Sequence, residues 1–295
     1  MFAGIGALIG AVLMGRATTP VVGVLEQPPQ CSRTRPVGLR PLFARRGDSW
    51  TALLTQDSLR SLELGARQFT LAFDGRSLGT LNTSDPGFQG DTDWFTRDHF
   101  LDIEPGQRLP RVANRSHRFE GWCDAPAVRP IVAVTSDHYE DPESWKPFQP
   151  SPALRDSLFP AFRTVVGDAT VCRKRKEPGR TDSTEHDVAY PYTARDLVVI
   201  AAYRNVRGRE IVGLEISESI RPCDYFMDPQ VLGHWFLVGA TPTLLGDNMD
   251  LVDAGDYDGD GKSELLFWTS GDDRDSYVLM YDDFAKRSEF YWNYH

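Results

Sequence analysis

The sequence predicts a protein that is mainly β with some α, an α+β chain whose C-terminal part is an antiparallel β meander packed on a mixed α+β middle region. Short runs rich in β-branched and aromatic residues recur along the chain, and Gly- and Asp-rich turns separate them. One longer segment has helical character behind a capping serine. With 295 residues, of which 41% are hydrophobic, the chain is long enough to bury a substantial core.

The first 17 residues have the pattern of a signal peptide. Phe2–Met14 is an apolar run of thirteen residues, which is too short to span a bilayer. Small residues at Gly15 and Ala17 suit cleavage after Ala17, although no Lys or Arg precedes the run, so a buried helix is the alternative. We therefore expect a secreted or periplasmic protein with no stable membrane span after removal of the leader.

Residues 18–48 are rich in Pro and Arg, and this composition predicts a linker or arm. Their five arginines could contact anionic lipid or polysaccharide, but a solvated tether is the simpler interpretation. These arginines are Arg33, Arg35, Arg40, Arg45 and Arg46.

The middle region, residues 49–230, mixes hairpin and helix patterns. Strand-forming residues flank the turn Asp74-Gly75 between Gln68 and Leu81, which predicts a hairpin. A second hairpin is expected from Asp196–Tyr203 and Ile211–Ile216.

Two further elements are expected in this region. Arg129–Val134 has the composition of a buried strand. Ser151 suits the cap of a helix over Ala153–Phe162, which Pro160 should kink or end.

Four cysteines are spread widely, and none lies two residues from another, so a zinc knuckle or a redox motif is not indicated. In an exported chain they permit two disulfides with three possible connectivities, whereas a cytosolic chain would keep them as thiols. We favour Cys172–Cys223, because this bond would brace the long charged loop between them. The remaining two are Cys31 and Cys123.

Residues 231–295 predict a β-sheet unit of short strands joined by Gly/Asp-rich turns. One such sheet cannot bury both of its faces alone, so it must pack on the middle region or on a partner. Trp235, Trp268 and Trp292 are expected in its core rather than on a carbohydrate-stacking platform. The strands are expected at His234–Val238, Leu251–Ala254, Leu265–Trp268, Tyr277–Tyr281 and Phe290–Tyr294.

Negative charge is concentrated in this last segment. From Asp247 to His295 there are thirteen Asp and Glu against four Lys and Arg, which is −9 of the total net charge of −10. Such a segment repels phosphates, so nucleic acid is not an expected partner. It suits a module that binds a cation.

The sequence Asp256-Tyr-Asp258-Gly-Asp260-Gly-Lys262-Ser-Glu264 places carboxylates at alternate positions of a short loop. Hard divalent cations take oxygen ligands at about 2.3–2.6 Å, and a tight loop turns alternate carboxylates inward to supply them. We predict one Ca²⁺ held by the side chains of Asp256, Asp258, Asp260 and Glu264 and by the Lys262 carbonyl, with the sharp turn at Gly261. A solvated acidic turn without an ion is the alternative.

The loop is not an EF-hand, because Phe267 stands where the closing glutamate would be and strand-forming residues follow. The segment Leu251–Leu265 instead resembles the calcium loop of FG-GAP/VCBS repeats, the integrin-α-type propeller blade. The resemblance covers about the last sixty residues, in a single copy, and implies one blade-like sheet that serves as a scaffold or binding surface. It departs from the family at Glu264, where such repeats usually carry Asp.

Catalytic patterns are sparse. Asp137-His138-Tyr139-Glu140-Asp141 and Glu185-His186-Asp187 are the two clusters that suit acid/base or transition-metal chemistry, although solvated loops explain both. The basic run Arg173–Lys176 is expected in a solvated loop, or docked on an acidic surface such as the C-terminal segment.

Two functions are consistent with these patterns. The first is an exported, calcium-stabilised, non-enzymatic binding or structural protein whose partner is a protein or a glycan. The alternative is a secreted hydrolase, with its site in the middle region and the calcium unit as support. Convergence of Asp137, His138, Glu185 and His186 in one cleft would favour the hydrolase.

Overall fold

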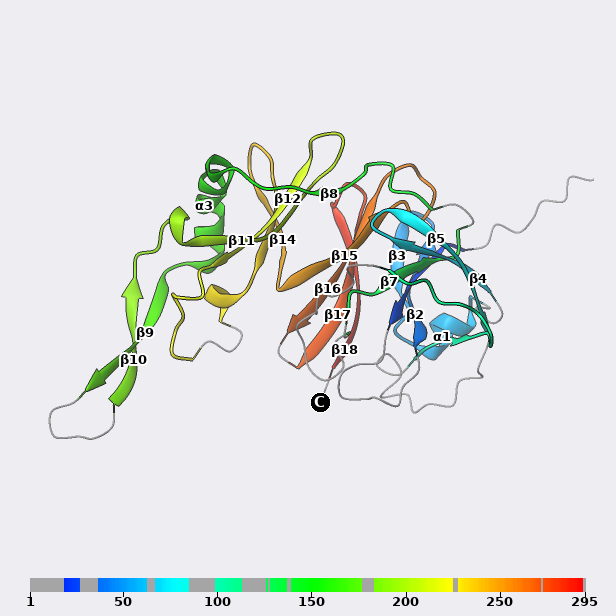
Figure 1. Ribbon diagram of the computed structural model, residues 1–295, viewed down its shortest axis with the longest axis horizontal. Helices are drawn as coiled ribbons and strands as arrows, with labels where there is room; N and C mark the ends of the chain where they lie inside the picture. Colours follow the sequence, from blue (N-terminus) through cyan, green and yellow to red (C-terminus); the bar gives the residue numbers. More distant parts are fainter. Residues whose placement is uncertain are drawn as a thin grey trace, which may run out of the picture.

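The computed structural model describes residues 19–26, 37–62, 67–84, 99–112, 126, 128–136, 139–176, 183–224, 228–271 and 273–293. Within these ranges the chain forms antiparallel β-sheets, with a long helix, a short helix and two 3₁₀ turns beside them. The prediction of a mainly β protein is confirmed. The sheets follow one another along the molecule, as Figure 1 shows.

The first sheet has seven strands in the order β3-β2-β1-β7-β4-β5-β6. Leu39 and Leu101 exchange backbone hydrogen bonds of 3.3 and 2.8 Å, so the sheet curls until strand β2 meets the segment before β6. Its elements are β1 (Val21–Glu26), β2 (Gly38–Arg46), β3 (Ser49–Ala52), α1 (Gln56–Arg60), β4 (Gln68–Phe73), β5 (Arg76–Ser84), β6 (Asp102–Ile103) and β7 (Ile131–Val134). The hairpin predicted around Asp74-Gly75 is the pair β4–β5.

The prediction of a linker or arm over residues 18–48 is wrong for the residues that the structure describes. All six residues of β1 are buried, and β1 pairs with both β2 and β7. Arg40 of β2 is 1% exposed, and its guanidinium lies 3.1 Å from the likewise buried Glu26 carboxylate, which compensates its charge. The arginines of this segment predicted that it would be exposed to solvent. A charged side chain can nevertheless be buried when it is paired with a buried group of opposite charge.

The second sheet has five strands in the order β14-β13-β12-β11-β8. The predicted hairpin is confirmed as β11–β12. The elements of this region are β8 (Lys146–Pro147), α3 (Pro152–Val166), the 3₁₀ turn Ala194–Asp196, β11 (Leu197–Arg204), β12 (Glu210–Ile216), the 3₁₀ turn Pro229–Val231, β13 (His234–Leu237) and β14 (Thr243–Asp247).

Helix α3 packs on one face of this sheet. Ser151 caps it, as predicted, by accepting a 3.2 Å hydrogen bond from the Leu154 amide. The helix does not end at Pro160 but continues to Val166. Leu158 and Phe162 are fully buried on either side of the proline, and this burial offsets the backbone hydrogen bond that proline cannot make.

A two-stranded ribbon, the arm (Ala169–Tyr190), projects from the end of the molecule that carries α3 (Figure 1). It consists of β9 (Ala169–Lys176) and β10 (Ser183–Tyr190). The predicted disulfide Cys172–Cys223 is present at the base of the arm, with 4.6 Å between the two Cα atoms. Cys31 and Cys123 lie outside the described residues.

The third large sheet is a four-stranded meander in the order β15-β16-β17-β18. One predicted member is misplaced: His234–Leu237 is β13, which pairs with β12 and β14 of the five-stranded sheet. The last unit therefore begins near Met249 rather than at residue 231. Its strands are β15 (Met249–Gly255), β16 (Glu264–Gly271), β17 (Arg274–Tyr281) and β18 (Lys286–Asn293).

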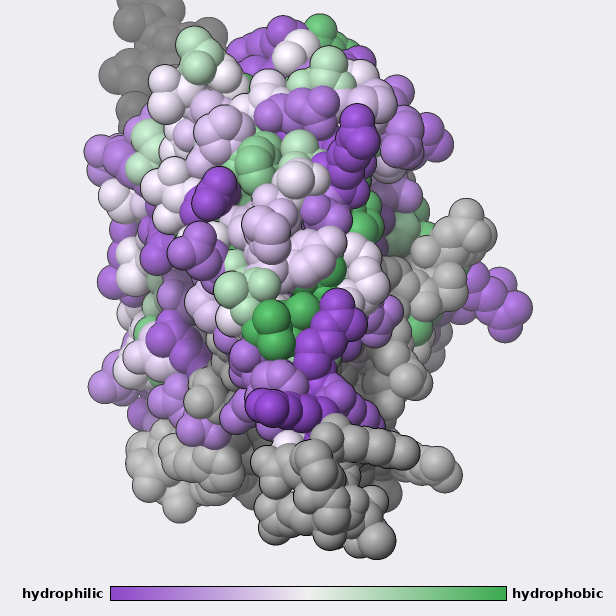
Figure 2. Space-filling model, turned by 90° about the vertical axis from the view of Figure 1, so that its left-hand side faces the viewer, coloured by the Kyte–Doolittle hydropathy of each residue, from purple (hydrophilic) through white to green (hydrophobic). Residues whose placement is uncertain are grey.

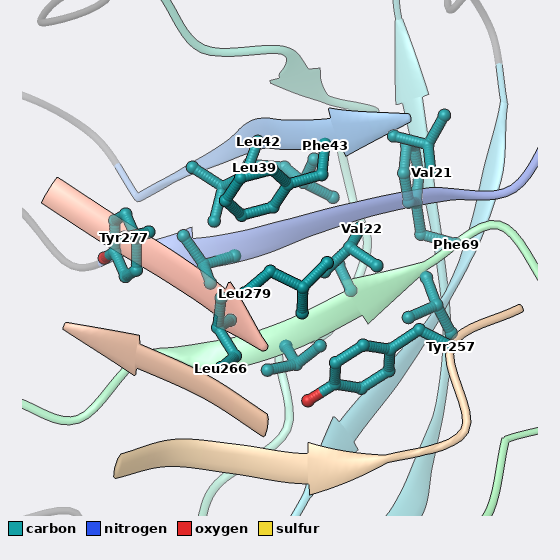
Figure 3. Packing of buried hydrophobic residues seen from close by; sticks show 14 of the residues in the cluster. Val21, Val22, Leu39, Leu42, Phe43, Phe69, Tyr257, Leu266, Tyr277 and Leu279 are labelled. Carbon is teal, nitrogen blue, oxygen red and sulfur yellow. The ribbon is translucent and has the colours of Figure 1, made fainter. Parts of the chain in front are cut away.

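The four-stranded sheet lies between the other two and packs on both. Figure 3 shows Leu266, Tyr277 and Leu279 from one face against Leu39 and Phe43 of the curled sheet. On the other face, the cluster that contains the Phe267 side chain joins it to the five-stranded sheet. Both faces of the four-stranded sheet are therefore covered. This agrees with the expectation that such a sheet cannot bury both of its faces alone.

The three predicted core tryptophans are buried. Trp235, Trp268 and Trp292 are each at most 2% exposed. The Trp235 ring lies 5.4 Å from Phe267 across the sheet interface, and Trp268 lies 5.5 Å from Trp292. These rings are core residues, and none is a carbohydrate-stacking platform.

The predicted leader, residues 1–17, lies outside the described residues. Among the helices that are described, none has the length and apolar character needed to cross a membrane. Figure 2 shows the end of the molecule that is on the left in Figure 1; among its coloured residues, hydrophilic side chains predominate and hydrophobic ones gather in small patches.

Candidate metal centre

The predicted calcium loop, which we call the acidic loop (Asp256–Glu264), connects β15 to the start of β16. Asp256, Asp258 and Asp260 each place one carboxylate oxygen within 4.8 Å of the others. Ligand oxygens on opposite sides of a Ca²⁺ ion are about 4.6–5.2 Å apart, because each lies about 2.3–2.6 Å from the ion. The three oxygens are thus close enough together for one such ion to contact all of them.

The backbone of the acidic loop folds around Asp256. Its Oδ1 accepts hydrogen bonds from the amides of Gly259 at 2.7 Å and Asp260 at 3.1 Å, and its Oδ2 accepts one from Gly261 at 2.8 Å. Gly259 and Gly261 have φ values of 78° and 82°. Residues with a side chain rarely adopt this conformation, which is why glycine stands between Asp258 and Asp260 and again after Asp260.

The Glu264 carboxylate, a further predicted ligand, does not belong to the group of three aspartates. The Lys262 amide donates to Asp260 at 2.8 Å, and its ammonium lies 2.9 Å from Asp283. Glu264 is 3% exposed and accepts a 2.8 Å hydrogen bond from the Tyr257 amide. Burial raises the pKa of Glu264 to about 9, and the loop carboxylates add to this rise.

Arg45 is a neighbour of the loop that the sequence did not indicate. Its Nε lies 2.9 Å from Asp258 Oδ2, while the other oxygen, Oδ1, accepts from the Asp260 amide at 3.3 Å. Burial raises the pKa of Asp258, the Asp260 carboxylate raises it further, and Arg45 opposes both effects. Arg45 belongs to β2, so no local pattern around the loop announces it.

Tyr257, the second residue of the loop, anchors it to the core. Its side chain is fully buried, and its ring stacks 6.0 Å from that of Tyr139. Figure 3 shows it extending from the loop into the space between the four-stranded sheet and the curled sheet. The position of the loop is therefore set by packing as well as by charge.

A segment from the middle of the chain holds both ends of the loop, and we call it the clamp segment (Tyr139–Trp145). The Glu140 carbonyl accepts a 2.9 Å hydrogen bond from the Asp256 amide at the start of the loop. Near its end, the Ser263 hydroxyl donates to Asp141 Oδ1 at 2.5 Å. Asp141 also accepts a 2.6 Å hydrogen bond from the Trp145 amide, which fixes the turn of the clamp segment.

A cavity of about 380 Å³ lies on the other side of the clamp segment. Its lining comes from the β4–β5 turn, from β8 and β11, and from β15 just before the acidic loop. Asp253 of β15 lies at this cavity and is 1% exposed; it accepts a hydrogen bond from the Tyr139 hydroxyl. Burial raises the pKa of the Asp253 carboxyl to about 6, although the Arg129 guanidinium opposes the rise.

The two predicted catalytic clusters are only partly described. Asp137 and His138 lie outside the described residues. Glu185 and His186 are exposed on the arm, where Glu185 pairs with Lys174 at 3.4 Å. The described half of this constellation therefore lies on an open ribbon rather than in a cleft.

The basic run Arg173–Lys176 forms the second half of β9. It lies at the far end of the molecule from the acidic loop and does not dock on the C-terminal sheet (Figure 1). Arg173, Lys174 and Arg175 are exposed.

Comparison with known proteins adds no relative: no family model, no curated protein sequence and no solved structure matches the chain.

Proposed function

We propose that this chain is an exported, calcium-stabilised, non-enzymatic binding protein whose acidic loop holds one Ca²⁺. The observation that carries the proposal is the convergence of Asp256, Asp258 and Asp260 within 4.8 Å. Three carboxylates at this distance repel one another, and a divalent cation between them removes that cost. The proposed ligand set also includes the Lys262 carbonyl and the Glu264 carboxylate.

The position of the loop gives the ion its role. Tyr257 and the clamp segment tie the loop to the junction where the sheets meet. An ion that binds the folded loop but not the unfolded chain stabilises the folded state by mass action. Calcium would therefore stabilise the junction as a whole. In this proposal the four-stranded meander is a single FG-GAP-like blade that acts as a scaffold, and its partner is a protein or a glycan.

Thermal unfolding tests the proposal. The mature chain is compared in EDTA, in calcium and in magnesium, each at about 5–10 mM, because extracellular calcium modules often have dissociation constants of about 10⁻⁴–10⁻³ M. We expect a rise in melting temperature with calcium and a much smaller one with magnesium.

Two variants make the test specific. Asp260→Asn removes a carboxylate from the converged set and should abolish most of the calcium effect. Asp247→Asn is the matched control, because Asp247 is an exposed aspartate on β14, outside the loop. A calcium shift that survives in Asp260→Asn, or no shift in the wild type together with no bound metal by elemental analysis, would refute the proposed site.

A further inference from the structure

The cavity beside the clamp segment has the size and the construction of a small-ligand site. Its volume of about 380 Å³ is at the lower end of the range of about 300–1,000 Å³ that ligand pockets occupy. Gly75 of the β4–β5 turn packs so closely on Asp141 that a Cβ atom there would lie 2.8 Å from the Asp141 Cβ. The walls come from all three large sheets, so the folded junction holds the cavity in shape.

Acceptors and donors are interleaved around this cavity. The Arg129 guanidinium lies 2.7 Å from Asp74 and 3.5 Å from Asp253 Oδ1. The same Asp253 oxygen accepts from the Gly75 amide at 3.4 Å. Both contacts are long for hydrogen bonds, so this buried oxygen has capacity for a closer donor. A bound group with a hydroxyl at this point would supply one.

Aromatic rings form the apolar part of the lining. The Trp145 indole N–H is already donated to Glu143 at 3.1 Å, so Trp145 offers a ring surface. The Tyr203 ring stacks on Trp235 at 6.1 Å, which fixes its plane. Among the described residues, none forms a hydrogen bond with the Tyr203 hydroxyl.

We propose that this cavity binds a neutral polyhydroxylated ligand of monosaccharide size, with its hydroxyls held by Asp253, Arg129 and the Tyr203 hydroxyl and its ring against Trp145 and Tyr203. A hydroxyl both donates and accepts, so it satisfies carboxylate and guanidinium together. A purely anionic ligand meets three carboxylates, and a purely cationic one meets three basic groups. These are Asp74, Asp141 and Asp253, and Arg76, Arg129 and Lys146.

This inference names a class of ligand for the proposed binding function. It rests on that function only in assuming that the protein binds a ligand. The cavity does not need calcium for its chemistry. Asp141 nevertheless belongs both to its lining and to the clamp on the acidic loop, so the two sites share one structural element.

Saturation-transfer NMR on the full mature chain tests the proposal. The probes are glucose, galactose, mannose, N-acetylglucosamine and myo-inositol, each at about 10 mM so that millimolar dissociation constants are detected. Succinate and 1,4-diaminobutane serve as charged controls. Methyl glycosides of the sugars distinguish two sources of the ligand. A site for the end of a glycan tolerates a substituent on the anomeric oxygen and binds the methyl glycosides, whereas a site for a free sugar does not. We expect transfer to at least one polyol and none to the charged controls.

Two variants locate the binding. Asp253→Asn should weaken it about tenfold and Tyr203→Phe about threefold, consistent with loss of one hydrogen bond to a charged and to a neutral group. Asp48→Asn and Tyr291→Phe, which alter residues outside the cavity lining, should have no effect. Thermal unfolding checks each variant, and if Asp253→Asn does not fold, the Tyr203→Phe comparison decides.

Several outcomes would overturn the inference: no transfer to any polyol, preferential transfer to a charged control, or equal binding by the wild type and by every folded cavity variant. Measurements in EDTA and in calcium separate this result from the metal proposal. Polyol binding with no calcium shift and no bound metal supports the cavity and refutes the loop, and a calcium shift without polyol binding does the reverse.

Discussion

The acidic loop and the arm are both charged segments, yet one is packed against the core and the other projects from the molecule (Figure 1). The acidic loop sends Tyr257 into the core and is held at both ends by the clamp segment. The arm projects into solvent and is tied at its base by Cys172–Cys223 (Figure 1). The number of charges is therefore a poor guide to where a connection lies. A buried aromatic ring holds the acidic loop against the core, and a covalent bond ties the arm.

The acidic loop and the arm are also stabilised in different ways. Burial of Tyr257 contributes apolar area that is lost from water only in the folded state. The disulfide acts mainly on the unfolded chain, by restricting a loop closed over a separation of 51 residues. Three sets of substitutions test the differences between the acidic loop and the arm.

The largest expected effect is that of Tyr257→Ala. Removing a fully buried aromatic side chain from a core should lower the free energy of unfolding by about 3–5 kcal/mol. His186→Ala on the exposed arm is the control, and it should change the stability by less than about 0.5 kcal/mol. Urea denaturation monitored by tryptophan fluorescence measures both. Equal losses would mean that packing of Tyr257 does not distinguish the two connections.

The second effect concerns the arm. Replacing both Cys172 and Cys223 by Ser should lower the stability by about 2–4 kcal/mol, because the unfolded chain gains freedom. Hydrogen exchange followed by mass spectrometry should show the larger loss of protection in the arm and in the segment around Cys223. The acidic loop should keep most of its protection. Loss of protection in the loop to the same extent would show that the two regions unfold as one unit.

The smallest effect concerns the contact between Arg45 and the loop. Arg45→Gln removes a positive charge 2.9 Å from Asp258 and should raise calcium affinity by at least about threefold to tenfold, because a charge pair at this range contributes about 1 kcal/mol even at the dielectric of bulk water. Isothermal titration calorimetry measures the change, with Lys286→Gln as a control for loss of an exposed cation. Weaker calcium binding by Arg45→Gln would mean that Arg45 positions Asp258 and does not compete with the ion.

Local patterns predicted the elements whose determinants are close together in the sequence. The Asp74-Gly75 turn predicted β4–β5, and Ser151 predicted the start of α3. The alternation of acids predicted the turn of the acidic loop, because the hydrogen bonds to the Asp256 carboxylate all join residues at most five apart. These features depend on turn chemistry and short-range geometry, which a sequence states directly.

Sequence patterns gave wrong predictions where the place of a strand depended on a pairing partner far away in the sequence. Val21–Glu26 is a core strand although its surroundings are rich in Pro and Arg, since β7, more than a hundred residues later, pairs with it. His234–Leu237 has the composition of any short strand, and the choice between two sheets was made by its pairing with β12. Strand pairing is a long-range contact, and one sequence does not specify which edge a strand will join.

For the candidate sites, the sequence by itself determined the three carboxylates of the acidic loop, their spacing and the turn that brings them together. The tertiary structure alone decided that Arg45 lies beside Asp258, that the clamp segment holds the loop, and that Asp253 and Arg129 meet at a cavity. The reason is physical: a loop organises its own carboxylates through local hydrogen bonds. A cavity and its charges exist only after separate sheets have packed together.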